Sequence, residues 1–286
     1  MWLPCPAAGV SRALWNSGCR SIITTVRSFS ALVLGVAVMS VIGRVVGFAA
    51  WQAAAPLPMF GYTVVHTYPH DRDAFTQGLQ VLDGAFYEGT GLNGRSSIRK
   101  VKIETGEVLQ KRDVPAQYFG EGITVRGNEL FQLTWQSGVA LVYDRATFAP
   151  KRQFKYSGEG WGLTQDTTTL IMSDGSEFLR FLDPGTFAEK RRVRVTVAGA
   201  PLKNLNELEY VKGEVFANVW QTDYVARIDP ATGNVNGYID FRGLLTSRER
   251  EATDVLNGIA YDEATDRLFI TGKLWPRVFE VRVTRK

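Results

Sequence analysis

Short runs of alternating apolar and polar residues follow one another from about residue 60 to the end of the chain. Five of these runs open on related motifs: TQGLQV (76–81), GEGITV (120–125), GWGLTQ (160–165), LNELEY (205–210) and LNGIAY (256–261). Alternation with a period of two is typical of β-strands, and no stretch shows a convincing helical period. The pattern therefore predicts an all-β fold.

The five motifs recur at nearly regular intervals. Aligning Gly78, Gly122, Gly162, Glu207 and Gly258 gives spacings of 44, 40, 45 and 51 residues. A second strand follows each motif, and a third leads to turns such as YDRATF and IDPATG, whose residues favour turns. A repeat of this length suits one four-stranded blade, so we predict a five-bladed β-propeller rather than a two-domain sandwich. The strand at 62–68 is expected to complete the last blade and close the ring.

Propeller geometry predicts which residues share one face. The innermost strands begin at one end of the channel, and antiparallel second strands finish at that same end. The residues from strand starts are Phe75, Gln77, Phe119, Glu121, Trp161, Asn206 and Asn257, and those from second-strand ends are Glu88, Trp135, Asp174, Trp220 and Lys273. Each one alone also fits a packing, capping or surface role. Together they predict an aromatic pocket, because polar groups around a narrow axis are costly unless paired or used.

Residues 1–55 have the composition of a targeting segment. They hold four arginines, both cysteines and no acidic residue, and they contain the apolar run 29–43 followed by the small residues AAAPLP. This order is typical of a signal peptide cleaved near Ala53–Ala55, and the alternative is an uncleaved membrane anchor. We therefore expect an exported protein, periplasmic or extracellular, or else anchored facing outside the cytoplasm. Residues 56–286 form the expected five-bladed β-propeller domain.

Charge and metal-binding residues narrow the function of that domain. Its 29 basic and 29 acidic residues cancel, although the whole chain carries a formal charge of +4. A neutral body has no field that would steer it onto nucleic acid or anionic lipid. It has no cysteine and only His66 and His70, for which a loop or packing role is expected, so we predict no transition-metal site. A closed propeller leaves little free strand edge, which favours a monomer.

Seven motifs carry a resemblance to a known family. In chain order they are FTQGL, FGEGI, WGL, NELEY, NVWQTD, LNGIAYD and TGKLWP, spread over about residues 61–283. They resemble the glutamine cyclotransferases of the plant and bacterial type, which are five-bladed propellers. The resemblance implies that the chain converts the N-terminal glutamine of peptides or proteins to pyroglutamate and releases ammonia, without a cofactor. Only the long N-terminal segment departs from the family pattern.

The resemblance also implies roles for individual residues. It implies that Glu121 is the proton-transfer residue. It also implies that the substrate pocket is formed by Phe75, Gln77, Phe119, Trp135, Trp161, Asn206, Trp220 and Lys273. The reaction develops an oxyanion, for which Lys273, Asn206 and Gln77 are the candidate donors. Two other functions stay open: a calcium-dependent lactonase-type propeller hydrolase and a non-catalytic peptide-binding propeller. Five repeats rather than six, and an ammonium near the axis, argue against the lactonase.

Overall fold

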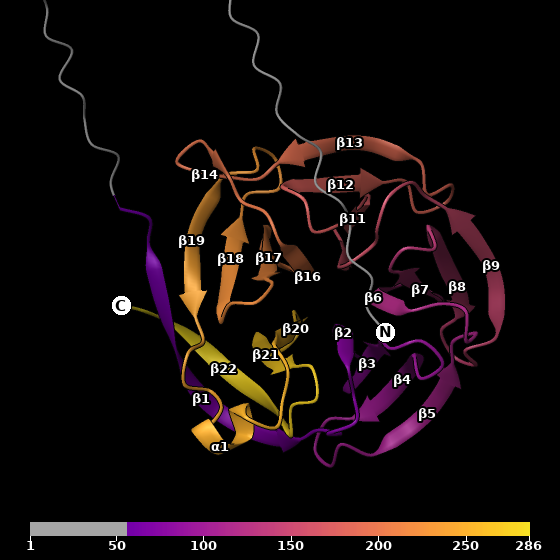
Figure 1. The fold of residues 1–286 in the computed structure, drawn as a ribbon, viewed down its shortest axis with the longest axis horizontal. Helices are drawn as coiled ribbons and strands as arrows, with labels where there is room; N and C mark the ends of the chain where they lie inside the picture. Colours follow the sequence, from indigo (N-terminus) through magenta and orange to yellow (C-terminus); the bar gives the residue numbers. More distant parts are fainter. Residues whose placement is uncertain (1–55) are drawn as a thin grey trace, which may run out of the picture. The chain divides into compact units, whose positions relative to one another are not determined.

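The computed structural model describes residues 56–286, which fold almost entirely into β-strands (Figure 1). The proposed targeting segment, with its cleavage site and both cysteines, lies outside the described residues. Within residues 56–286 the single helix is α1, Ser247–Arg250, where Thr246 and Glu249 form a reciprocal capping box. No helix in this part of the chain has the length and apolar character needed to cross a membrane.

Three four-stranded antiparallel sheets follow one another in the first half of the fold. Each sheet is built from strands in chain order, so neighbours in sequence are neighbours in the sheet. Their strands are β2 (Thr76–Leu82), β3 (Ala85–Thr90), β4 (Ser97–Lys102) and β5 (Val108–Asp113); β6 (Gly120–Arg126), β7 (Glu129–Thr134), β8 (Val139–Asp144) and β9 (Pro150–Lys155); and β10 (Leu163–Gln165), β11 (Leu170–Met172), β12 (Phe178–Leu182) and β13 (Glu189–Arg194). A small hairpin, β14 (Thr196–Val197) and β15 (Ala200–Pro201), follows.

The remaining strands form one sheet of eight, in the order β16-β17-β18-β19-β1-β22-β21-β20. Its strands are β16 (Leu205–Val211), β17 (Glu214–Val219), β18 (Tyr224–Ile228), β19 (Val235–Asp240), β20 (Leu256–Asp262), β21 (Arg267–Gly272), β22 (Arg277–Arg285) and β1 (Met59–Pro69). β1 pairs with β22 over nine residue pairs, but with β19 only at Met59 and Phe60. The expectation that the strand at 62–68 completes the last strand group is confirmed.

The first strand of each group of four lies innermost, and these strands form a closed ring. β2 contacts β6, β6 contacts β10, β10 contacts β16, β16 contacts β20, and β20 returns to β2. Figure 1 shows β2, β6, β16 and β20 around the middle of the fold. The inner strands are almost wholly buried, whereas β5, β9 and β13 at the outside are mostly exposed. Apolar side chains pack between neighbouring sheets, as where Phe131 and Leu133 of β7 meet Met172 of β11. This packing fixes the inner strands, and therefore the residues at their starts.

Glycines allow the inner strands to approach one another closely. A methyl group on Gly122 would lie 2.6 Å from the backbone nitrogen of Leu163, and one on Gly162 would lie 2.1 Å from the carbonyl oxygen of Asn206. No side chain fits at such distances, so only glycine is tolerated there. Gly78 is confined in the same way by the backbone of Ile123, whereas Gly258 is required by its positive φ of 137°.

The fifth aligned position, Glu207, uses its side chain instead. Its Oε1 accepts a hydrogen bond from the backbone N–H of Leu79 in β2 at 3.2 Å, and its Oε2 accepts one from Ile259 in β20 at 2.9 Å. The carboxyl group therefore joins three inner strands across the ring.

The strand predicted from GWGLTQ is shorter than expected, because β10 begins at Leu163 rather than at residue 160. The Ser173 hydroxyl accepts a hydrogen bond from the Gly162 backbone N–H at 2.8 Å, in place of the regular ladder partner. Trp161 N still donates to the Ser173 carbonyl oxygen at 3.0 Å. The backbone thus leaves strand geometry at residues 160–162, while Trp161 stays beside Ser173.

Candidate active site

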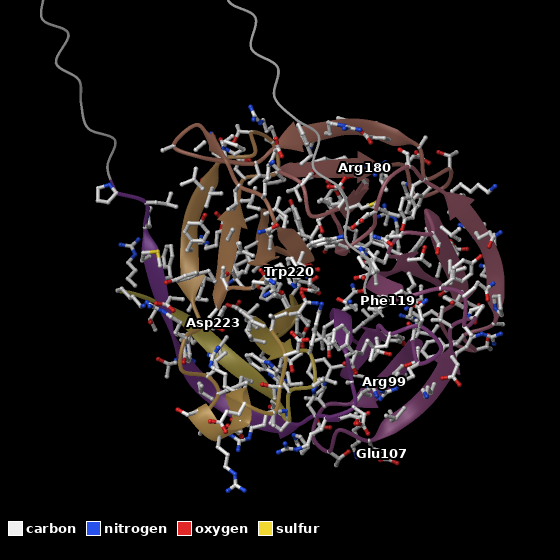
Figure 2. The ribbon with its side chains drawn as sticks, in the orientation of Figure 1. Arg99, Glu107, Phe119, Arg180, Trp220 and Asp223 are labelled. Atoms are coloured by element: carbon white, nitrogen blue, oxygen red, sulfur yellow. The ribbon has the colours of Figure 1, made fainter. Side chains whose placement is uncertain are left out.

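A cavity of about 430 Å³ opens where the inner strands begin. All nine side chains predicted for the pocket line it. They are Phe75, Gln77, Phe119, Glu121, Trp135, Trp161, Asn206, Trp220 and Lys273, joined by Gln221, Asp254 and Val255, which sequence reasoning missed. Phe119 and Trp220, which come from different sheets, both lie near the middle of the ring (Figure 2).

Backbone hydrogen bonds explain why these residues meet. Each of three residues just beyond a second strand donates its N–H to a residue just before an inner strand. The bonds run from Trp135 to Phe119 (3.0 Å), from Trp220 to Asn204 (2.9 Å) and from Lys273 to Val255 (3.0 Å). The prediction that Trp135, Trp220 and Lys273 occupy matching places in their sheets is confirmed.

Glu121 lies at the base of the cavity, with only 5% of its surface exposed. Gln77 Nε2 donates to Glu121 Oε1 at 3.2 Å, and Gln77 Oε1 in turn accepts from Asn257 Nδ2 at 3.3 Å. Asn257 does not line the cavity, although it was predicted on this face. Its place is behind Gln77, where it orients the amide that contacts Glu121.

The site combines two buried ionisable groups of opposite type. Burial raises the pKa of the Glu121 carboxyl well above its usual range; the Lys273 ammonium opposes that shift, and the Glu159 carboxylate adds to it. Burial lowers the pKa of Lys273, against the pull of Glu121 and Asp254. The Lys273 ammonium also lies 4.8 Å from the centre of the Phe75 ring, a cation–π contact. The Glu121 carboxyl therefore holds a proton more readily than an exposed glutamate does.

Aromatic rings form the walls of the cavity in edge-to-face contacts. The ring centres of Phe75 and Phe119 are 6.2 Å apart, and those of Phe119 and Trp135 are 5.7 Å apart. Across the cavity mouth, Trp161 and Trp220 meet at 5.5 Å with an angle of 81° between their planes. Such pairs pack rigidly, so the walls present a fixed apolar shape around one carboxyl group and one amine.

Glu159 holds two of these walls in place. Its Oε2 accepts hydrogen bonds from the indole N–H groups of Trp135 at 2.7 Å and Trp161 at 2.8 Å. Its Oε1 accepts from Gln136 Nε2 at 3.0 Å. Burial opposes its charge, but these three donors lower the pKa of the Glu159 carboxyl overall, so it stays ionised. Glu159 was absent from the predicted site.

Motif alignment contained the signal for two of the four missed residues. Glu159 and Val255 stand three residues before an aligned glycine, as do the predicted residues Phe75 and Phe119. Three of these four positions line the cavity, so counting back three from each glycine would have drawn attention to Glu159 and Val255. Gln221 directly follows Trp220 at the turn that ends β17, and no pattern marks Asp254.

Two other predicted residues take up structural roles away from the cavity. Glu88 is fully buried in a network with Arg99 (2.5 Å), His70 (3.0 Å) and Thr76 (2.7 Å). Asp174 accepts a hydrogen bond from Ser176 within its own turn. Neither lines the cavity. Across residues 56–286, no group of three or more His, Cys, Asp or Glu side chains is arranged to hold a metal ion.

Comparison with known proteins gives a consistent result. The family model for glutamine cyclotransferase matches residues 37–283. A glutaminyl-peptide cyclotransferase of Arabidopsis thaliana is 45% identical over 228 residues, which cover 77% of this chain and 70% of the relative. The crystal structure of Myxococcus xanthus glutaminyl cyclase superposes with a TM-score of 0.73 at 37% identity, covering 80% of this chain and 99% of that one.

Proposed function

Because this chain belongs to the glutamine cyclotransferase family, we infer that it is a glutaminyl-peptide cyclotransferase, which converts N-terminal glutamine to pyroglutamate and releases ammonia. Its substrates are peptides or proteins with a free N-terminal glutamine. The observation that carries the proposal is the buried Glu121 carboxyl at the base of an aromatic cavity, with Lys273 and Gln77 beside it.

We also infer that the sheets are the five blades of a β-propeller. The closed ring of five inner strands supports this, as does the four-stranded order of three separate sheets. The eight-stranded sheet is then two blades, β16–β19 and β20–β22 with β1, whose outer strands β19 and β1 meet through only two residue pairs.

The first task of the site is to fold the substrate onto itself. The nucleophile, the α-amine, is tethered to the γ-amide that it attacks, so the barrier falls if the side chain is held curled with the reacting atoms close together. The rigid walls Phe119, Trp161 and Trp220 enclose a space that suits a curled glutamine side chain. Apolar walls also keep competing water away from the amide carbon.

Glu121 carries the proton in the proposed reaction. Ionised Glu121 takes a proton from the α-amine as its nitrogen bonds to the γ-amide carbon, and then gives that proton to the departing nitrogen, which leaves as ammonia. One N–C bond forms and one breaks, and the carboxyl group returns to its starting state. A pKa raised by burial suits this role, because the carboxylate is then a stronger base toward the α-amine than an exposed glutamate would be.

Polar groups around the cavity stabilise the charge that develops on the amide oxygen. Lys273 and the Gln77 and Asn206 carboxamides are the donors in reach. Asn206 Oδ1 is buried and has no hydrogen-bond partner among the described residues. We propose that it accepts an N–H of the substrate's γ-amide, which would favour glutamine over glutamate, because a carboxylate brings no such donor.

A pair of variants tests the proton-transfer role. Glu121→Gln keeps the size of the side chain but removes the transferable proton, so turnover of a glutamine-initiated dipeptide should fall about 100- to 10,000-fold. Lys273→Ala should also lower turnover. If Lys273 acts as one oxyanion donor, its loss should raise the activation free energy by roughly 3 to 4 kcal/mol. Ammonia release and mass spectrometry of the product, measured across pH, distinguish the two variants.

The pH profiles of the two variants should differ. In the wild type, kcat/KM at acid pH should be inversely proportional to the square of the proton concentration, because two groups must be deprotonated. These groups are Glu121 and the substrate α-amine, whose ordinary pKa is about 7.7–8.0. Glu121→Gln should leave only the substrate dependence. Lys273→Ala should keep both, with the Glu121 limb moved to higher pH, because Lys273 holds the pKa of Glu121 down. A Glu121→Gln enzyme within threefold of wild type would contradict the proposal.

A further inference from the structure

A second cavity, of about 570 Å³, adjoins the site just described. Three residues, Gln221, Asp254 and Val255, line both cavities, so the two share a wall. The second cavity is bounded by the turn after β17 and by the segment between α1 and β20, and we call it the outer groove. Its lining includes Asp223, Arg250, Glu251, Thr253, Asp254 and Trp275. Asp223 lies farther from the middle of the ring than Trp220 (Figure 2).

The outer groove has an apolar floor and a polar rim. Trp275 is 2% exposed and is held by a hydrogen bond from its Nε1 to the Asp254 carbonyl oxygen at 2.9 Å. Thr253 Oγ1 is buried and has no hydrogen-bond partner among residues 56–286. A groove of this size with a fixed aromatic floor has the features of a ligand-binding surface.

Negative charge predominates in the outer groove. Its lining contains three carboxylates, Asp223, Glu251 and Asp254, and one guanidinium, Arg250. Arg250 is paired with Asp223 at 3.1 Å, whereas Glu251 and Asp254 form no ion pair within 4.0 Å in the described part of the chain. The Lys273 ammonium of the catalytic cavity acts on Asp254 from the far side of the shared wall. Glu251 therefore remains the least compensated charge.

A peptide whose first residue occupies the catalytic cavity must leave that cavity through its second residue. We propose that the outer groove binds the residues that follow the N-terminal glutamine, and that it favours a basic side chain there over an acidic one. This inference rests on the proposed function, because only a peptide substrate continues beyond the cavity. Extended chain covers about 3.3–3.6 Å per residue, so the second and third residues are the ones that reach a neighbouring groove.

The test is a set of amidated tripeptides, Gln-Lys-Ala, Gln-Ala-Ala and Gln-Glu-Ala, offered to the wild-type protein at low ionic strength. We expect kcat/KM to decrease in that order, with about a 10-fold difference between the lysine and glutamate peptides, the scale of one or two exposed charge pairs. The difference should lie in KM rather than kcat, and added salt should reduce it.

Glu251→Gln locates the preference. It should reduce the ratio between the lysine and glutamate peptides at least twofold, mainly by raising KM for the lysine peptide. Glu104→Gln is the matched control, because Glu104 is exposed in the turn between β4 and β5, and it should keep the full ratio. Equal kcat/KM for all three peptides would overturn the inference and leave the proposed function standing. No turnover of any of them would overturn the proposed function, and the inference with it.

Discussion

Glu159 is the residue that most changes the picture of the site. One carboxylate oxygen holds the indoles of Trp135 and Trp161, which approach it from different sheets, and the same charge acts on Glu121. It therefore combines two effects, a geometric one on the cavity walls and an electrostatic one on the proton-transfer group. The two effects can be separated, because a glutamine carbonyl can accept the same hydrogen bonds without carrying a charge.

Replacing Glu159 should therefore have two distinct outcomes. Glu159→Ala frees both indoles and should raise KM about 10-fold, since two cavity walls lose their fixed orientation. Glu159→Gln should keep KM near the wild-type value but lower the pKa of Glu121, so the acidic limb of kcat should move to lower pH. The other groups that act electrostatically with Glu121 are Lys273 and Tyr156, which these variants leave in place.

Gln136→Ala is the control for both variants. It removes the bond to Glu159 Oε1 and leaves both indole bonds intact, so KM and the pH profile should stay within about twofold of wild type. Identical pH profiles for wild type and Glu159→Gln would contradict the electrostatic role, and an unchanged KM in Glu159→Ala would contradict the geometric one.

At the residue scale, the sequence was sufficient for the nine pocket side chains but not for their supports. The pocket residues repeat at equivalent motif positions, so geometry and the family resemblance both point to them. Asn257 and Glu159 act through hydrogen bonds to Gln77 and to the tryptophans. Hydrogen bonds of this kind depend on how side chains from neighbouring sheets point toward one another. The spacing of motifs in the sequence does not encode those directions. Glu88 was misplaced because it lies within β3, whereas Gly91, just beyond that strand, takes the place that matches Trp135. Arg99 holds Glu88 in a buried ion pair.

At the scale of single strands, Gly122 controls how closely β6 and β10 approach. A methyl group there would meet the backbone of Trp161 and Leu163 at 2.6 Å, and backbone cannot move aside as a flexible side chain can. Gly122→Ala should lower the free energy of unfolding by about 1–3 kcal/mol, the usual cost of overpacking. It should also reduce turnover, because Glu121 and Trp161 lie directly beside the forced-apart strands.

Denaturant unfolding and dipeptide turnover measure these two effects. Gly61→Ala is the control, since a methyl group there would meet only the side chains of Lys286 and Thr284, at 3.3 Å, near the end of β22. We expect it to change neither quantity appreciably. A Gly122→Ala protein with wild-type stability and turnover would show that the inner strands are not held at this spacing.

Strand lengths were less predictable than strand order. The repeat of the motifs predicted which segments pair, and the register of β6 with β7 and of β20 with β21 follows it. The start of β10 was wrong because a side-chain hydroxyl, Ser173, replaces a backbone partner there. Substitutions of this kind leave the hydrophobic pattern unchanged, so periodicity cannot reveal them.

At the scale of the whole described fold, closure depends on the two ends of the chain. β1 pairs with β22 along almost its entire length, so the first strand covers what would otherwise be the free edge of the last one. The sequence predicted this pairing from a single unmatched strand at 62–68. It did not predict the contact with β19, which arises because β1 begins earlier, at Met59, and reaches one strand further.

The position of β1 bears on the proposed processing of the N-terminal segment. Cleavage near Ala53–Ala55 would leave β1 whole, because the strand begins at Met59, whereas cleavage beyond about residue 60 would begin to remove its pairing with β22. We therefore predict that the exported protein begins near Pro56. N-terminal sequencing of protein recovered from outside the cytoplasm checks this. A start before Arg44 would contradict cleavage and favour a membrane anchor. A start after Pro69 would contradict the closure argument, because such a chain would expose the edge of β22 and should aggregate rather than remain an active enzyme.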